Sequence, residues 1–181
     1  MSAKDTVLVA MFAALTAALG LLPPIPVPFV PVPATGQTLG IMLSGCVIGA
    51  RRAALAMLLL LVLLALGLPL LSGGRGGLGV FVGPSAGYLI AWPLAAYCIG
   101  AFVSRFGASI GVLFLANCVG GIGLVYVVGV PIMALVLDLS VGNAALAGSV
   151  FLPGDLIKAG VASAVASAVL RAYPTQKNAQ A

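Results

Sequence analysis

Long apolar stretches without charge are the feature that most constrains the fold of this chain. The run from Ala53 to Leu71 contains nineteen residues and no charged side chain, and a membrane-spanning helix needs roughly 17 to 25 residues. Hydrophobic residues make up 62% of the 181 residues and charged residues 6%, whereas soluble domains contain about 25% charged residues. The sequence therefore predicts an all-α integral membrane protein.

Six segments are apolar enough to be transmembrane helices, and we expect them to form a single membrane domain over residues 1–181. The second segment is short for a full span. A glycine-rich outer loop is expected at residues 72–85, between the third and fourth helices. The predicted helices cover about residues 6–22, 38–50, 53–71, 86–104, 109–132 and 154–172.

Positive charges predict the orientation in the membrane. With the N-terminus inside, six of the eight cations fall at cytoplasmic helix ends, namely Lys4, Arg51, Arg52, Arg105, Arg171 and Lys177. This distribution follows the positive-inside rule and predicts that both termini are cytoplasmic. Because the cations are scattered and form no basic run, a nucleic-acid partner is not expected.

A proline-rich segment, residues 23–37, joins the first two predicted helices. Six of the twelve prolines lie between Pro23 and Pro33. Proline removes a backbone donor and disfavours helix at the residue before it, so this segment is expected to be extended. Apolar residues between the prolines indicate that it lies against the protein. With the predicted topology, the segment, the glycine-rich loop and the start of the last helix meet on the outer face.

Two ionisable residues near the start of the last helix are the strongest candidates for function. Asp155 and Lys158 are three residues apart, which places them on one face of a helix. Ionisable groups in membrane segments are costly and usually mark a functional site. The alternative is a structural ion pair that neutralises itself. A carboxylate beside an ammonium group suits a ligand that has both N–H and C=O or carboxylate groups.

The glycine-rich loop is a second candidate. Gly74, Gly76 and Gly79 formally match GxGxxG, but no strand precedes them and no βαβ unit surrounds them, so a dinucleotide site is rejected. Backbone N–H groups of this loop, including that of Gly77, are expected to face a ligand. Arg75 either meets an anionic group of the ligand or lies at the level of the lipid headgroups.

Four further polar or aromatic residues are candidates for ligand contact, each with a structural alternative. Tyr88 either stacks on a bound ring or belongs to an interfacial aromatic belt with Trp92. Asn117 either faces the cavity or bonds a neighbouring helix. Gln37 and Thr38 either contact ligand or cap the second helix.

Small residues recur every four positions on the first helix, at Ala10, Ala14 and Ala18. Such a ridge allows close helix packing in lipid. It serves either packing within this chain or docking to a separate membrane partner. The chain has no histidine, and its three cysteines lack ligand spacing, so no metal site, cofactor or catalytic residue is predicted.

Four blocks of sequence together resemble the BioY family, the biotin-specific S components of energy-coupling-factor (ECF) transporters. They are PVPFVPVPATGQTLG, GARRAALA, GLPLLSGGRGGLGVFVGPSAGYLIAWPLAA and FLPGDLIKA. The resemblance runs from about Ala10 to Arg171 and implies a multi-pass protein of a prokaryotic cell membrane. It also implies that biotin is bound near the outer face as the transported substrate, with Asp155 and Lys158 matching the PGDxxK block of the family.

The resemblance implies further roles and partners. The proline-rich segment would be a lid, with Pro28, Phe29 and Val30 at its centre and a hinge at 34–36. The alanine ridge would dock to a transmembrane coupling subunit, which brings two ATPase subunits. The alternatives are a stand-alone biotin permease, an S component for another small vitamin-like ligand, an intramembrane enzyme, or a structural bundle that binds nothing.

Overall fold

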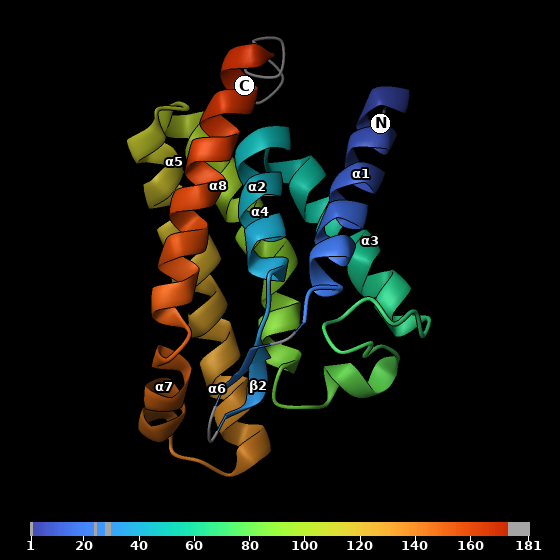
Figure 1. The fold of residues 1–181 in the computed structure, drawn as a ribbon, viewed down its shortest axis with the longest axis vertical. Coiled ribbons are helices and arrows are strands. Elements are labelled where there is room, and N and C mark those ends of the chain that lie inside the picture. Colours follow the sequence, from blue (N-terminus) through green and yellow to red (C-terminus); the bar gives the residue numbers. More distant parts are fainter. Residues whose placement is uncertain (1, 24, 28–29, 174–181) are drawn as a thin grey trace.

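The computed structural model describes residues 2–23, 25–27 and 30–173. Apart from one small hairpin, the regular secondary structure of the described residues is helical, which confirms the all-α part of the predicted fold class (Figure 1). Its elements are α1 (Ala3–Gly20), β1 (Ile25–Val27), β2 (Val30–Ala34), α2 (Gln37–Ile48), α3 (Ala50–Ala65), η1 (Leu78–Phe81), α4 (Ala86–Phe106), α5 (Ile110–Ala116), η2 (Asn117–Leu124), α6 (Val125–Leu137), α7 (Val141–Ser149) and α8 (Leu152–Ala172).

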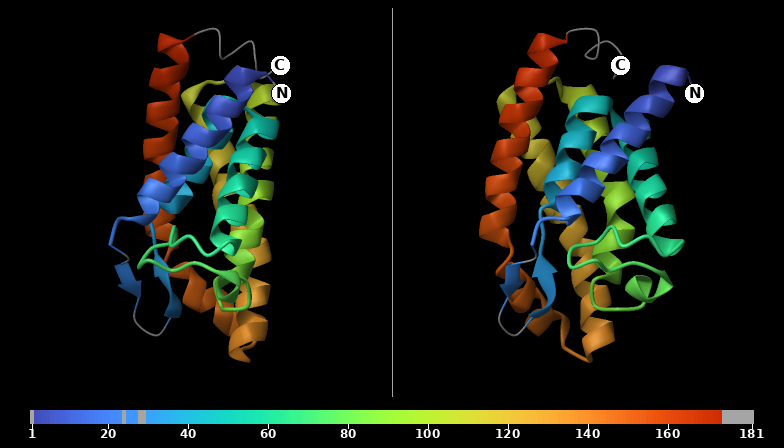
Figure 2. Two further views of the ribbon diagram at one scale, coloured as in Figure 1. Left: turned by 90° about the vertical axis from the view of Figure 1, so that its right-hand side faces the viewer. Right: turned by 45° about the vertical axis from the view of Figure 1, so that its right-hand side comes forward.

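The helices run alternately between two ends of the bundle. α1 begins and α8 ends at the same end, which we call the terminal end (Figure 1). The hairpin, the glycine-rich loop and α7 lie at the opposite end, the hairpin end (Figure 2). In the described part of the chain, four helical segments are long and apolar enough to cross a membrane: Ala3–Gly20, Ala86–Phe106, Ile110–Leu137 and Leu152–Ala172.

Residues 25–27 and 30–34 of the proline-rich segment are extended, as predicted, and the two stretches pair with each other. β1 and β2 pair antiparallel, with Ile25 opposite Ala34 and Val27 opposite Val30, and the register shifts between the two pairs. Proline lacks the N–H group that a regular ladder needs, which accounts for a ladder this short. Pro28 and Phe29, two of the proposed lid residues, lie outside the described residues; the third, Val30, is the first residue of β2.

Local sequence explains several helix ends. Ser2 and Asp5 form a reciprocal capping box at the start of α1. α3 ends at Ala65, whereas the sequence predicted a helix that continues to Leu71. Gly67 follows with φ 98°, and Pro69 cannot continue a helix, so the chain turns here.

The fifth helical segment is longer than predicted and contains a π-helical centre. α5, η2 and α6 run continuously from Ile110 to Leu137, past the predicted end at residue 132. The connection that follows also contains a helix, α7, whose start is capped by the side chain of Ser140. α7 was not predicted because its nine residues are too few to span a membrane and carry no long apolar run.

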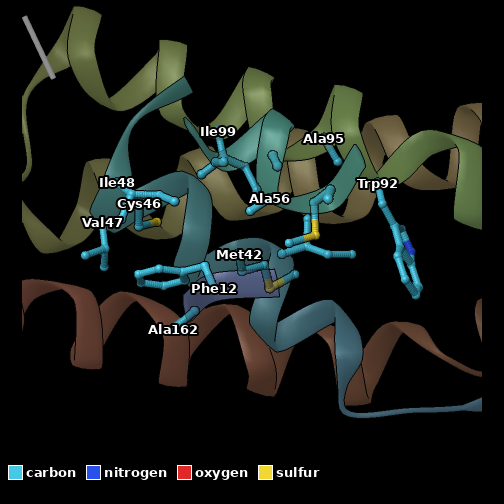
Figure 3. Close-up of a cluster of buried hydrophobic side chains, with 14 of the residues drawn as sticks. Phe12, Met42, Cys46, Val47, Ile48, Ala56, Trp92, Ala95, Ile99 and Ala162 are labelled. Atoms are coloured by element: carbon cyan, nitrogen blue, oxygen red, sulfur yellow. The ribbon is translucent and has the colours of Figure 1, made fainter. Parts of the chain in front are cut away.

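The core is formed by side chains from several helices that approach closely. Figure 3 shows Phe12 of α1, Met42 of α2, Ile99 of α4 and Ala162 of α8 in one cluster, and all four are buried. Small residues make this approach possible, since a Cβ atom added at Gly45 would lie 2.6 Å from Cβ of Ile99. Gly45 therefore serves packing within this chain.

Candidate ligand-binding site

A pocket opens at the hairpin end, between segments that are far apart in the sequence. It is lined by β2, the start of α2, the loop after α3, α4, α6, and the start of α8. Its cavity volume is about 80 Å³. A cavity needs about 10–15 Å³ of this volume to hold one water molecule. The pocket therefore has room for a small organic molecule.

Asp155 lies at the centre of the polar wall of this pocket and is 5% exposed. Its Oδ1 accepts hydrogen bonds from Lys158 Nζ at 2.9 Å and from Thr38 Oγ1 at 3.3 Å. Its Oδ2 accepts one from the hydroxyl of Tyr126 at 2.8 Å. The carboxylate is thus bound by side chains from α2, α6 and α8.

Lys158 forms the predicted pair with Asp155 and also reaches α2. Its Nζ donates to Thr38 Oγ1 at 3.0 Å in addition to Asp155. An ammonium group has three donors, so one N–H of Lys158 has no acceptor among the described residues and is available to a ligand. The Lys158 side chain is 23% exposed and the Asp155 side chain 6%, so the ammonium group is the more accessible partner.

Aromatic side chains form the apolar side of the pocket. The rings of Tyr88 and Tyr126 meet edge to face, with centroids 6.2 Å apart and planes at 84°. Trp92, one helical turn after Tyr88, also lines the pocket and is 5% exposed. With Phe151 and Leu89 they provide a surface suited to an apolar ring.

Arg75 lines the pocket at its exposed rim. Its Nε donates to the carbonyl oxygen of Ser72 at 3.3 Å. The ion pairs of the described residues join Asp5 to Arg52 and Asp155 to Lys158, so Arg75 has no carboxylate partner among them. Because the Asp155–Lys158 pair is neutral by itself, Arg75 gives the pocket an excess of one positive charge.

Some of the remaining predicted residues line the pocket and others do not. Gln37 and Thr38 line the pocket, but the Gln37 amide is directed to the carbonyl oxygen of Leu70. The backbone N–H of Gly77 donates to Leu64 O at 2.7 Å and is not free for a ligand. Gly77 does not line the pocket.

Asn117 also lies away from the pocket, in the middle of the bundle. Its Nδ2 donates to Ser163 Oγ at 3.1 Å and to Ala159 O at 3.5 Å, and its Oδ1 accepts from Cys46 Sγ at 3.4 Å. Of the two alternatives raised by the sequence, bonding between helices is the one this arrangement supports. These contacts join η2 to α2 and α8.

Tyr126 is the main pocket residue that was not predicted. It is the one described tyrosine whose hydroxyl contacts Asp155, yet it lies within an apolar run, YVVGVPIMALVL. The available signal was a phenol in an otherwise apolar segment, on the part of the helix that approaches the hairpin end. Phe151 and Ser85 also line the pocket without having been predicted.

The proposed docking ridge lies outside the core. Ala10, Ala14 and Ala18 are exposed on α1, while Ala13, in the neighbouring row, is 3% exposed. Packing of α1 within this chain therefore uses Ala13 and leaves the other three alanines available. Within residues 2–23, 25–27 and 30–173, no group of three His, Cys, Asp or Glu side chains is placed to hold a metal ion.

This fold and pocket define the class of the protein: a multi-pass helical membrane protein with a pocket at one end of its bundle. The model of the BioY family matches residues 1–175. The chain belongs to the BioY family.

Relatives and a solved structure agree with this assignment. The chain is 48% identical over 182 residues to the biotin transporter BioY of Rhizobium etli, covering 96% of this chain and 97% of that one. It is 44% identical over 169 residues to the probable biotin transporter BioY of Bacillus subtilis, covering 93% and 91%. The crystal structure of an S component for biotin from an ECF-type ABC transporter matches with a TM-score of 0.90 and 30% identity, covering 94% of this chain and 95% of that chain.

Proposed function

We propose that this chain is the substrate-capture subunit, or S component, of a biotin uptake transporter, and that biotin is bound in the pocket at the hairpin end. It is a transport subunit and not an enzyme, in keeping with its family and with the S component that it matches. The observation that carries the proposal is the Asp155–Lys158 pair, facing a pocket whose other walls are aromatic and aliphatic.

The chemistry of biotin fits these walls. Biotin has a ureido group with N–H donors and a C=O acceptor, an apolar thiophane ring, an aliphatic chain and a carboxylate. Asp155 accepts a ureido N–H, and Lys158 donates its third N–H to an oxygen. The thiophane ring lies against Tyr88 and Trp92, and the carboxylate lies at the rim beside Arg75. Each charge-assisted bond contributes about 1.5–3 kcal/mol.

The hairpin lies over this pocket and is proposed as its lid. Val32, Pro33 and Ala34 of β2 line the pocket, so a movement of β2 would widen or narrow the entrance for a ligand. The proposed hinge at residues 34–36 falls between the end of β2 and the start of α2.

We infer a topology of six passages with both termini in the cytoplasm. Four cations lie at helix ends that belong to the terminal end of the bundle. They are Lys4 at the start of α1, Arg51 at the start of α3, Arg105 at the end of α4 and Arg171 at the end of α8. This clustering supports a cytoplasmic terminal end by the positive-inside rule. Lys177 lies outside the described residues. The hairpin end then faces the outside, where biotin enters the pocket.

The proposed partners are a transmembrane coupling subunit and two ATPase subunits, which supply ATP hydrolysis. Support comes from the matched S component, whose transporter is of the ECF type, and from the exposed alanines of α1. A smooth ridge of small side chains suits close approach of a second membrane helix.

Calorimetric titration of the purified chain with biotin tests the function. We expect saturable binding of one biotin per chain, with weaker binding of analogues that lack the ureido group or the carboxylate. If biotin does not bind, or if another vitamin-like compound binds more tightly, the proposal is wrong.

A further inference from the structure

We propose that Tyr126 is a positioning residue that orients the Asp155 carboxylate and thereby selects ligands with an unsubstituted ureido N–H. This inference rests on the proposed function. Tyr126 belongs to α6, and Asp155 belongs to α8. Their side chains meet at 2.8 Å between the phenol oxygen and Oδ2, the shortest of the three bonds to this carboxylate.

The hydrogen bonds of Asp155 leave little capacity for a ligand. A carboxylate has about four lone-pair positions. Lys158 and Thr38 occupy Oδ1, and Tyr126 occupies one position on Oδ2. One position on Oδ2 remains. A ligand can therefore place a single N–H on Asp155, in a direction set by the Tyr126 hydroxyl.

The Tyr126 ring is itself held in place by its neighbours. Its edge-to-face partner, Tyr88, packs against the backbone of Gly129, where an added Cβ atom would lie 2.6 Å from Cε1 of the Tyr88 ring. A side chain at position 129 would displace Tyr88, and through it Tyr126. Gly129, Tyr88 and Tyr126 thus form a continuous path of contacts from α6 through α4 to the carboxylate of Asp155.

The remaining donor lies next to the remaining acceptor. The third N–H of Lys158 is close to the free position on Asp155, because Lys158 Nζ is 2.9 Å from Oδ1 of the same carboxylate. The complementary ligand group carries one N–H and one C=O side by side, as a cyclic urea does. When the Tyr126 hydroxyl is removed, the carboxylate gains a second free position and rotational freedom, so the preference for a single N–H weakens.

The test is Tyr126→Phe, which removes the hydroxyl and retains the ring. We measure calorimetric Kd values for biotin and for two analogues that are methylated on one or the other ureido nitrogen. The expected result is an approximately tenfold loss of biotin affinity, because the Asp155 carboxylate, once freed from Tyr126, must be ordered when biotin binds. For each analogue, the ratio of its Kd to the Kd of biotin measures discrimination against the methyl group. The larger of the two ratios found for the wild-type protein should be smaller in the Tyr126→Phe variant. An unchanged ratio means that Tyr126 only packs against the ligand.

A double-mutant cycle tests whether Tyr126 acts through Asp155. In an Asp155→Asn background, Tyr126→Phe should change the biotin Kd by less than twofold, whereas full additivity of the two substitutions overturns the proposal. Tyr97→Phe is the matched control, because Tyr97 is 49% exposed and outside the pocket. Wild-type protein that fails to bind biotin refutes the proposed function itself. If the wild-type protein binds biotin and the effects of Tyr126→Phe and Asp155→Asn are additive, only the role of Tyr126 is refuted.

Discussion

Gln37 donates a hydrogen bond from Nε2 to the backbone carbonyl oxygen of Leu70 across 3.2 Å. The first residue of α2 is therefore attached to the loop that follows α3. A second bond of the same kind joins Ser72 Oγ to the carbonyl oxygen of Leu22 at 2.9 Å. The proline-rich segment is thus held at both of its ends by residues 70–72.

Removing these bonds should loosen the proposed lid. Gln37→Ala leaves the Leu70 carbonyl without its partner, and we expect a loss of about 1–3 kcal/mol in the free energy of unfolding. Biotin should dissociate faster, and Ser72→Ala should act in the same direction. Thermal unfolding and stopped-flow dissociation measure the two effects. Asn143→Ala is the control, because Asn143 is exposed on α7. Unchanged dissociation in both variants would show that these bonds do not restrain the lid.

Asp155→Asn should weaken biotin binding by about 10- to 100-fold, since it removes a charge-assisted acceptor. The substitution also leaves Lys158 without its counter-ion. Calorimetry gives the affinity, and thermal unfolding shows whether the variant is folded. The control is Asp138→Asn at the exposed end of α6, where φ is 53° and asparagine is tolerated. Equal biotin affinity of the Asp155→Asn variant and the wild-type protein would remove Asp155 from the site.

Lys158→Ala distinguishes a ligand contact from a structural ion pair. The Lys158 side chain is 23% exposed, so we expect a fall in biotin affinity of at least tenfold, as for one charge-assisted bond of about 1.5 kcal/mol or more, with a folded protein. Lys4→Ala, at the exposed start of α1, provides the comparison. The structural role would be favoured by two results together: the Lys158→Ala variant is partly unfolded, and its folded fraction binds biotin as tightly as the wild-type protein does.

Arg75→Gln should lower affinity only for ligands with a carboxylate. Because Arg75 is exposed, we expect roughly a two- to fivefold loss for biotin, corresponding to about 0.5–1 kcal/mol, and no loss for biotin amide. The difference should shrink at high salt. Arg105→Gln at the terminal end is the matched control. An equal loss for both ligands would mean that Arg75 supports the loop and does not contact the carboxylate.

Ala14→Leu should separate ligand binding from transport. Ala14 is exposed on α1 and remote from the pocket lining, so biotin binding should be retained. Co-purification with the coupling subunit and ATP-dependent biotin uptake should fall, because leucine prevents close approach of a partner helix. Ala164→Leu makes the same change at an exposed position of α8. If Ala164→Leu abolishes co-purification and Ala14→Leu does not, the docking face is on α8.

Features that depend on local spacing were predictable from the sequence. The three-residue interval between Asp155 and Lys158 places both on one helical face, and the structure shows them as an ion pair at 2.9 Å. The run of prolines predicted extended backbone, and residues 25–27 and 30–34 are extended. Alternation of the helices then brings this segment to the same end as Asp155.

Features that depend on tertiary contacts were not predictable in the same way. Nothing in the local pattern around Tyr126 shows that it faces α8, because helical phase is altered in η2, just before it. Asn117 has the polarity of a ligand contact, but Ser163 and Cys46 happen to lie opposite it. The antiparallel pairing of β1 with β2 was also not predictable. A run of prolines is compatible with one continuous extended segment as well as with two paired strands.

The π-helical segment η2 sets the rotational phase of α6 relative to α5. A π turn closes with a bond to the fifth residue along, where an α turn uses the fourth. If the residues of Asn117–Leu124 were all kept but formed ordinary α turns, the extra residue of the π turn would rotate all of α6 by about 100° relative to α5, given 3.6 residues per turn. Tyr126 would then leave Asp155, and Gly129 would leave Tyr88. The backbone geometry of this uncharged stretch is consequently under a constraint that its composition does not reveal: substitutions that keep it apolar but convert the π turns to α turns should be selected against.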